Sequence, residues 1–554
     1  MLAAVNCQAA KQVEPQIVPE PQSIEMTKGS LKLKGININC DPAMDSLSMS
    51  AVLQFADRLT LVSGKTTTVA CPPGLAKTID GGTLKGLYFI CDPSVAAEGY
   101  SISVKPRYAV VRASDFNGFL YSLQTIKQML PLAIYGTTPD VSADWSIPCC
   151  EIKDAPRFGY RGLMLDCCRH FWSVDEVKKV IDLMSIYKLN RLHWHLSDDQ
   201  GWRIEIDKYP LLTEVGGFRK GTMVGGDWNS NDGIRYGGYY TKDQIRDVID
   251  YAAQRGITII PEIDLPGHMQ AALTAYPWLG CKDSKPQPYE VWTRWGISSQ
   301  VLNVGKEETM VFLEDVLGEV ADLFPSEYIH IGGDECPRDE WEKDPICQAK
   351  VKELGLKDKD GISATARLQN YVTSRMQKSL EAKGKKIIGW DEILEGDLDE
   401  GATVMSWRGT AGGIKAANKG FDVIMAPYTH CYIDYAQSGD LDKEPFSITH
   451  QWATPENAWQ VAVTLEKLYG FDPLAEIPEA NQSHILGVQC NLWTEYIATP
   501  EHLEYMLFPR VMALSEVQWC DPSVKDIDRF KESLTDRQLP LLDMLGVNYR
   551  KLDK

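Results

Sequence analysis

The pattern of apolar and polar positions changes near residue 152. Before it, residues 99–114 alternate apolar and polar side chains, as half-buried strands do, and residues 119–132 follow the period of an amphipathic helix. Residues 142–160 carry prolines and little periodicity, which indicates a domain boundary. We therefore expect a tail or signal remnant over residues 1–15, an α+β domain over 16–152 and a second domain over 153–554.

In the second domain, short apolar runs alternate with helical stretches. The expected strands are residues 161–166, 190–197, 257–263, 328–333, 386–392, 403–407, 421–427 and 484–491. Among the expected helices are one opened by Ser173 and Glu176, one opened by Thr241 and Gln244, and the stretches 306–323, 364–382 and 411–419; the first two beginnings are capping boxes. Eight strands in alternation with helices predict an α/β fold, a (β/α)8 TIM barrel.

Polar and aromatic side chains gather where these strands end, on the face that carries the chemistry of such barrels. They are Arg169, Asp198, Asp199, His268, Asp334, Glu335, Trp390, Asp391, Trp407, Tyr432, Asp434, Trp493 and Glu495. The adjacent pair of Asp334 and Glu335 is unusual, because neighbouring side chains of a regular strand point to opposite faces. The glycines before the pair relax that restriction. A solvated turn is the alternative for an isolated acidic pair, but the surrounding cluster favours a functional site.

Composition limits the partners of the chain. Its 554 residues exceed one ordinary domain, and the net charge of −19 disfavours a nucleic-acid partner. No apolar run approaches the roughly 18 residues of a transmembrane helix. Fourteen scattered cysteines suit neither a disulfide framework nor a zinc site. Fifteen tryptophans point weakly to sugar binding, although most of them are expected in the core.

Acids and tryptophans at a barrel mouth, without a phosphate loop, are typical of glycoside hydrolysis. The motifs RGLMLDCCRHF, HWHLSDDQGWRIEI, PEIDLPGH, HIGGDE, GWDE and NLWTE occur in this order. Over most of residues 16–525 the chain resembles glycoside hydrolase family 20, the β-N-acetylhexosaminidases. The resemblance implies an exo-acting, retaining enzyme without a cofactor or metal, which releases terminal β-linked N-acetylhexosamine from glycans. In this family the 2-acetamido group of the substrate replaces the enzyme nucleophile.

The resemblance also implies a role for each candidate residue. Glu335 would be the general acid and base, and Asp334 would orient the acetamide and stabilise the charge on it. The pair near the acid would be Asp198 and His268, although a histidine at a strand end is often only a satisfied hydrogen-bonding group. The substrate-binding residues would be Arg169, Asp434 and Glu495 on the sugar hydroxyls, Tyr432 on the acetamide oxygen, and Trp390, Trp407 and Trp493 around the acetamide. Trp452 and Trp459 lie in a stretch that departs from the family pattern, where packing is at least as plausible as sugar contact.

Two other functions remain open at this point. His193 and His195 resemble the H-x-H of metal-dependent barrel hydrolases, with His268 and Asp334 as further ligands. A non-catalytic sugar-binding protein could also use this barrel. The N-terminus, with small apolar residues and Cys7, together with the implied substrate, suggests a periplasmic, cell-surface or secreted protein.

Overall fold

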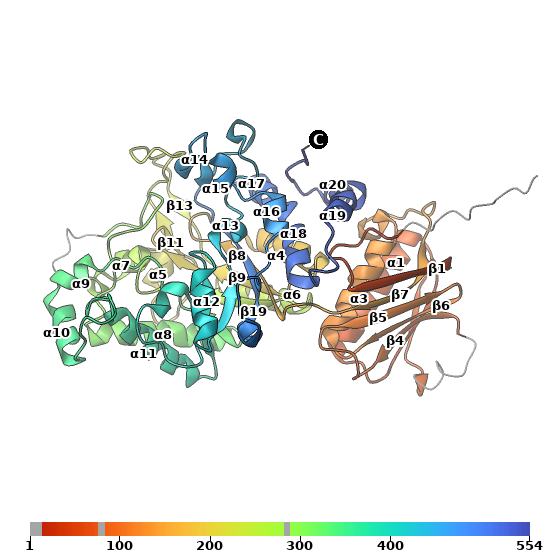
Figure 1. Cartoon of the computed structure of the whole chain (residues 1–554), viewed down its shortest axis with the longest axis horizontal. Coiled ribbons are helices and arrows are strands. Elements are labelled where there is room, and N and C mark those ends of the chain that lie inside the picture. The colour runs from red at the N-terminus through yellow and green to blue at the C-terminus, as the bar shows by residue number, and fades with distance from the viewer. Residues whose placement is uncertain (1–13, 76–83, 282–288, 554) are drawn as a thin grey trace, which may run out of the picture. The chain divides into compact units, whose positions relative to one another are not determined.

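The computed structural model describes residues 14–75, 84–281 and 289–553, and the chain forms two compact units (Figure 1). Met1–Arg157 and Trp519–Val547 form the N-terminal unit, and Phe158–Gln518 with Asn548–Lys554 form the barrel unit. Assigning all of 153–554 to the barrel therefore overlooks that Trp519–Val547 returns to the first unit. Most of the expected tail, including Cys7, lies outside the described residues.

The N-terminal unit is built on a seven-stranded mixed sheet with the order β1-β7-β5-β6-β4-β2-β3. Its strands are β1 (Ser23–Lys32), β2 (Asn37–Cys40), β3 (Thr68–Ala70), β4 (Gly86–Cys91), β5 (Tyr100–Lys105), β6 (Tyr108–Ala113) and β7 (Ser146–Asp154). The alternation over 99–114 forms the antiparallel pair β5 and β6. The segment expected to be a boundary contains β7, which pairs with both β1 and β5. Its prolines at 148 and 156 concealed a strand whose buried residues largely alternate.

Helices α1 (Ser46–Ser63) and α3 (Phe116–Met129) share one apolar core with the sheet. Each is capped by an aspartate, Asp45 or Asp115, whose side chain accepts the N–H of the third helical residue, which stabilises a helix start. The unit also includes α19 (Ile527–Ser533) and α20 (Leu539–Leu545) from the C-terminal segment. The helix expected over residues 119–132 corresponds to α3, which lies three residues closer to the N-terminus.

The barrel unit is a closed parallel barrel, as the sequence predicts. Its strands are β8 (Tyr160–Asp166), β9 (Arg191–His195), β14 (Thr258–Glu262), β15 (Tyr328–His330), β16 (Lys386–Trp390), β17 (Thr403–Ser406), β18 (Asp422–Met425) and β19 (Ile485–Leu492). The barrel closes where β19 pairs with β8. Every expected strand is present, so the carboxyl ends of all eight open on one face.

Helical segments follow the barrel strands along the chain (Figure 1). They include α4 (Val174–Ile186), α6 (Lys242–Ala253), α8 (Glu307–Leu323), α11 (Leu368–Glu381), α12 (Ala411–Asn418), α17 (Pro500–Leu507) and α18 (Arg510–Trp519). Both predicted capping boxes, at Ser173 and at Thr241, are present with their reciprocal hydrogen bonds. Among the described residues, none of the helices combines the length and the apolar character that crossing a bilayer requires.

Candidate active site

A cavity of about 680 Å³ opens among the carboxyl ends of the barrel strands. It is lined by eight of the predicted site residues: Arg169, Asp334, Glu335, Trp407, Tyr432, Asp434, Trp493 and Glu495. The other three, Asp198, His268 and Trp390, are almost fully buried and contact the lining residues. The structure thus gathers all eleven around one cavity.

The backbone between β15 and the acidic pair explains how two neighbouring carboxylates share this cavity. Gly332 and Gly333 have φ values of +63° and +104°, and Glu335 itself has φ +46°. A non-glycine residue in this left-handed region is uncommon, and strained residues of this kind cluster at functional sites. A Cβ on Gly332 would lie 1.8 Å from Asp264 Oδ1, so only glycine fits there. Because this turn is not a regular strand, its neighbouring side chains need not point to opposite faces, and both Asp334 and Glu335 line the cavity.

His268 connects the pair to a buried anion behind it. Its Nδ1 lies 3.2 Å from Asp198 Oδ1, and its Nε2 lies 3.6 Å from Asp334 Oδ2 and 3.7 Å from Glu335 Oε2. Although burial opposes the charge, Asp198 raises the pKa of His268 well above its usual value. The imidazolium is therefore placed to orient Asp334 and Glu335.

Asp334 is the more enclosed member of the pair, with 13% of its side chain exposed against 35% for Glu335. Burial raises the pKa of Asp334, Glu335 raises it further, and His268 opposes both effects. The Oδ1 atom of Asp334 is buried without a hydrogen-bond partner in the described part of the chain. An enclosed acceptor of this kind suits an N–H donor supplied by a ligand.

The guanidinium of Arg169 at the inner end of the cavity is held by several acceptors. Nη2 lies 3.0 Å from Asp198 Oδ2, Nε donates to Gln200 Oε1 at 3.0 Å, and Nη1 lies 4.0 Å from Glu495. Asp166 also lies 3.4 Å from Nη1. Although burial opposes the charge, these carboxylates raise the pKa of Arg169 well above its usual value. The cation is thus fixed in place before any ligand arrives.

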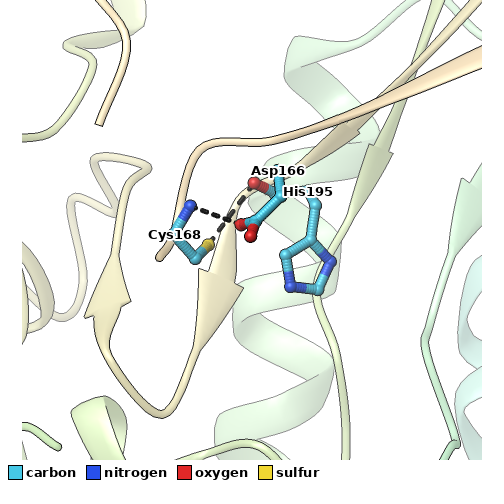
Figure 2. Close-up of side chains that lie close together, drawn as sticks. All are labelled: Asp166, Cys168 and His195. Atoms are coloured by element: carbon cyan, nitrogen blue, oxygen red, sulfur yellow. Dashed lines mark hydrogen bonds between the residues drawn. The ribbon is translucent and has the colours of Figure 1, made fainter. Parts of the chain in front are cut away.

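Asp166 shapes the loop that carries this arginine. Figure 2 shows Asp166, Cys168 and His195 together, with the Cys168 amide donating to Asp166 at 2.7 Å and the Cys168 thiol 3.4 Å from the His195 carbonyl oxygen. Asp166 also accepts the backbone amides of Arg169 and Thr494. One carboxylate therefore fastens the ends of β8 and β19 to each other.

Two further carboxylates, Asp434 and Glu495, complete the inner end. Burial raises the pKa of both groups, and for Asp434 the nearby Glu495 adds to the shift. Asp434 Oδ1 is buried and has no partner among the described residues. The inner end therefore offers a cation and two crowded carboxylates, a set that suits hydroxyl groups, which both donate and accept.

Aromatic rings form the adjoining wall. The rings of Trp407 and Tyr432 stack with centroids 6.1 Å apart, and Trp390 and Trp493 lie 6.0 Å apart. Two of the indole N–H groups have carboxylate acceptors: Trp390 donates to Glu262 at 2.9 Å, and Trp407 donates to Glu392 at 3.0 Å. The indoles are held in one orientation, so the wall keeps its shape.

Four acidic residues of the site were not singled out from the sequence. They are Asp166, Glu262, Asp264 and Glu392, all buried. Burial raises the pKa of Glu392 to about 8, and Asp334 adds to the shift. Each lies inside a quoted motif. Asp166 and Glu262 end the barrel strands β8 and β14, and an acidic residue in a buried parallel strand is the signal that could have identified these two.

The histidines of the metal hypothesis have other partners. His195 is bonded to Asp198 through Nε2, at 2.8 Å, and to Glu262 through Nδ1. His193 contacts Glu262 through Nε2 at 2.9 Å and accepts the side-chain amide of Gln489 at 3.0 Å. Their ring nitrogens are thus engaged in a hydrogen-bond network away from Asp334. Within the described ranges, no potential ligand cluster combines these two histidines with His268 and Asp334.

The outer rim of the cavity has a different composition. It is formed largely by exposed apolar and aromatic residues, including Trp228, Ile297 and Trp452. Trp452 is 65% exposed and lines the cavity, whereas Trp459 is 60% exposed and does not. Neither is therefore a core residue. Trp452 packs edge-on against Tyr435, with ring centroids 6.2 Å apart, and Trp459 lies against Gly439, so loop packing remains an alternative to sugar contact for both.

Comparisons with known proteins agree with this architecture. Residues 158–522 match the catalytic domain of Glycosyl hydrolase family 20, and residues 14–155 match domain 2 of the same family. A β-hexosaminidase of Porphyromonas gingivalis is 44% identical over 454 residues, covering 82% of this chain and 54% of that protein. The chain thus spans about half the length of that relative.

Two further comparisons cover a larger share of the matched protein. A β-hexosaminidase of Akkermansia muciniphila is 34% identical, covering 82% of this chain and 87% of that protein. The crystal structure of a GH20 exo β-N-acetylglucosaminidase from Vibrio harveyi, in complex with N-acetylglucosamine, superposes with a TM-score of 0.81 and 34% identity, covering 97% of this chain and 78% of that one. With both of its units matched, the chain belongs to glycosyl hydrolase family 20.

Proposed function

We propose that this protein is an exo-acting, retaining β-N-acetylhexosaminidase that removes single terminal N-acetylhexosamine residues from glycans. The observation that carries the proposal is the turn at Gly332–Glu335, which directs Asp334 and Glu335 into one cavity beside an aromatic wall. The names of the relatives, several of them β-hexosaminidases, support the substrate class.

The placement of the pair favours catalysis assisted by the substrate. A retaining enzyme with its own nucleophile needs carboxylates about 5–5.5 Å apart on opposite faces of the sugar, whereas these two come from consecutive residues of one turn. The acetamido oxygen of the substrate would attack the anomeric carbon while the bond to the leaving oxygen breaks and Glu335 donates a proton to it. Asp334 would hold the acetamide N–H and stabilise the positive charge of the oxazolinium ion. Water, deprotonated by Glu335, then opens this ring with overall retention.

The inner end of the cavity supports exo action on one sugar. Arg169, Asp434 and Glu495 close it with charged groups that suit hydroxyls, and a further sugar on that side would have to displace them. The leaving group would lie against the exposed rim that includes Trp228 and Trp452.

The decisive experiment combines product analysis with chemical trapping. Wild-type protein is incubated with aryl N-acetyl-β-hexosaminides and with chitin oligomers. We expect monosaccharide release with initial retention of the β anomer, followed by NMR. Release of disaccharides would contradict exo action, and binding without turnover would indicate a non-catalytic sugar-binding protein. A fluorinated sugar that labelled a carboxylate at the anomeric carbon would reveal an enzyme nucleophile and refute the assisted mechanism.

We also propose that the protein works in the periplasm, at the cell surface or outside the cell. The support is the small apolar N-terminal sequence with Cys7, which lies outside the described residues, and a glycan substrate. Fractionation of the native host with an antibody against the chain tests this proposal, and recovery only in the cytosol would contradict it.

A further inference from the structure

Glu262, the last residue of β14, is a fully buried carboxylate that faces four groups. Its Oε2 contacts His193 Nε2 at 2.9 Å and also His195 Nδ1; its Oε1 lies 2.9 Å from His330 Nδ1 and accepts the Trp390 indole N–H at 2.9 Å. An unpaired charge at this depth would be strongly destabilising. The contacts from β9, β15 and β16 compensate it, so this carboxylate is an organised centre beneath the cavity.

His195 lies between two carboxylates. Its Nδ1 faces Glu262 and its Nε2 faces Asp198 Oδ2 at 2.8 Å. Ionised carboxylates only accept hydrogen bonds, so satisfying both contacts requires a proton on each ring nitrogen. Although burial opposes the charge, Glu262 and Asp198 raise the pKa of His195 well above its usual value. His193 differs, because one ring nitrogen accepts from Gln489 and burial lowers its pKa to about 4.

Asp198 connects His195 to two residues of the active site. The Oδ2 atom that contacts His195 also lies 3.0 Å from Arg169 Nη2, and Oδ1 lies 3.2 Å from His268 Nδ1. A carboxylate free to rotate could not keep both contacts. The contact with His195 fixes its orientation, and with it the direction in which His268 faces Glu335.

We propose that Glu262 and His195 are positioning residues for glycoside hydrolysis, an inference that rests on the proposed function. Glu262 holds His195 as an imidazolium, and His195 orients Asp198 toward both Arg169 and His268. Through its other oxygen, Glu262 also holds the indole of Trp390. Neither residue lines the cavity, so each acts through groups that contact the substrate or its acid. One buried anion thereby links the aromatic wall to the proton donor.

The first test compares two buried glutamates. Glu262→Gln keeps the size of the side chain and removes its charge. Glu504→Gln is the matched control, because Glu504 is also buried and ion-paired but bonds Lys179 and the Asn548 amide, away from the cavity. We expect kcat/KM to fall about 10- to 100-fold in Glu262→Gln, the loss found when an outer-shell partner that orients a metal ligand is removed, with kcat as well as KM affected. Glu504→Gln should keep kcat/KM within about twofold of wild type, the range of a change outside the site. Equal losses in both variants would overturn the proposal.

The dependence of activity on the leaving group distinguishes a positioning role of Glu262 from a general loss of folded structure. A dinitrophenyl N-acetyl-β-glucosaminide needs little help from the acid, whereas the disaccharide of N-acetylglucosamine needs full protonation of its leaving oxygen. If Glu262 positions the acid, Glu262→Gln should lose more activity on the disaccharide. An equal loss on both substrates that follows the folded fraction, measured by circular dichroism, would show a purely structural role.

The second test needs neither activity nor a stable Glu262 variant. Nitrogen-15 NMR of histidine-labelled wild-type protein, with His195 assigned through His195→Gln, reports the protonation of the ring. We expect His195 to carry protons on both nitrogens at neutral pH and, where Glu262→Gln folds, to lose one in that variant. A neutral His195 in the wild type would refute the inference even if the enzyme hydrolyses glycosides. Wild-type protein that is inactive but contains a doubly protonated His195 would refute the proposed function alone.

Discussion

The two ends of the cavity differ in polarity and in exposure to solvent. At the inner end, Arg169, Asp434 and Glu495 are ionisable and largely buried, and the arginine is held by Asp166, the last residue of β8, and by Asp198, which follows β9. At the outer rim, Trp228, Ile297 and Trp452 are apolar and exposed. Buried polar groups discriminate strongly, because a ligand that leaves them unpaired loses binding energy. Exposed aromatic surfaces discriminate weakly, so under the proposed function the comparison predicts strict recognition of the terminal sugar and loose recognition of the leaving group.

Asp334 and Glu335 lie between these two ends, and their substitution should have the largest effect. Glu335→Gln removes the acid and should slow turnover of substrates with poor leaving groups by about 100- to 10,000-fold, with a much smaller loss on activated aryl glycosides. Asp334→Asn should slow both kinds by about 100- to 1,000-fold, since acetamide attack depends on its charge. Steady-state kinetics on both substrates distinguishes the roles; identical patterns for the two variants would contradict them.

The inner end is tested next by Arg169→Lys. Lysine keeps the charge but loses the planar set of donors that contacts Asp198, Gln200 and Glu495. We expect kcat/KM to fall about 10- to 100-fold, the equivalent of about 1.5–3 kcal/mol for hydrogen bonds to a charged group. The loss should be the same for every leaving group. A loss confined to one class of leaving group would show that the two ends are not independent.

The barrel and the site cluster were predictable because they depend on local regularities. Apolar runs at strand length, two capping boxes and polar residues at strand ends are all visible in the sequence, and the barrel rule places those ends together. By contrast, the sequence could not predict that Trp519–Val547 belongs to the N-terminal unit. The apolar pattern of an amphipathic helix shows which face is buried but not which core covers it.

Other features depend on contacts between distant segments. The left-handed conformation of Glu335 follows from the turn against Asp264, which strand periodicity cannot reveal. The network around Glu262 joins several strands, and its members look in sequence like isolated polar residues. The rim combines Trp228 and Ile297, which lie in loops, with Trp452, the last residue of the short helix α14 (Ile448–Trp452), so only the folded chain shows that they line one cavity.

Stability provides a second test of the inner end. Burial and Glu495 raise the folded-state pKa of Asp434 above that of the unfolded chain, which is about 3.9. The group therefore contributes stability that is fully present below the unfolded pKa and is lost as the pH rises through the folded value. Asp434→Asn should remove this loss and raise the free energy of unfolding at neutral pH by about 0.5–2 kcal/mol, the common size of a single stabilising substitution. Denaturation at neutral and acidic pH measures it; a gain that does not shrink toward acidic pH would contradict this explanation.

The smallest effect is expected at the rim, from Trp452→Ala. Its exposed indole lines the cavity, so it should contribute the energy of one aromatic contact, about 0.5–1.5 kcal/mol. KM for an oligosaccharide should therefore rise about two- to tenfold, while kcat and the kinetics on a small aryl glycoside change little. Trp459→Ala is the matched control, because Trp459 is nearly as exposed and lies outside the cavity lining. If Trp452→Ala lowered kcat/KM as much as Arg169→Lys does, the rim would recognise its ligand as strictly as the inner end. That result would contradict the difference proposed between the two ends.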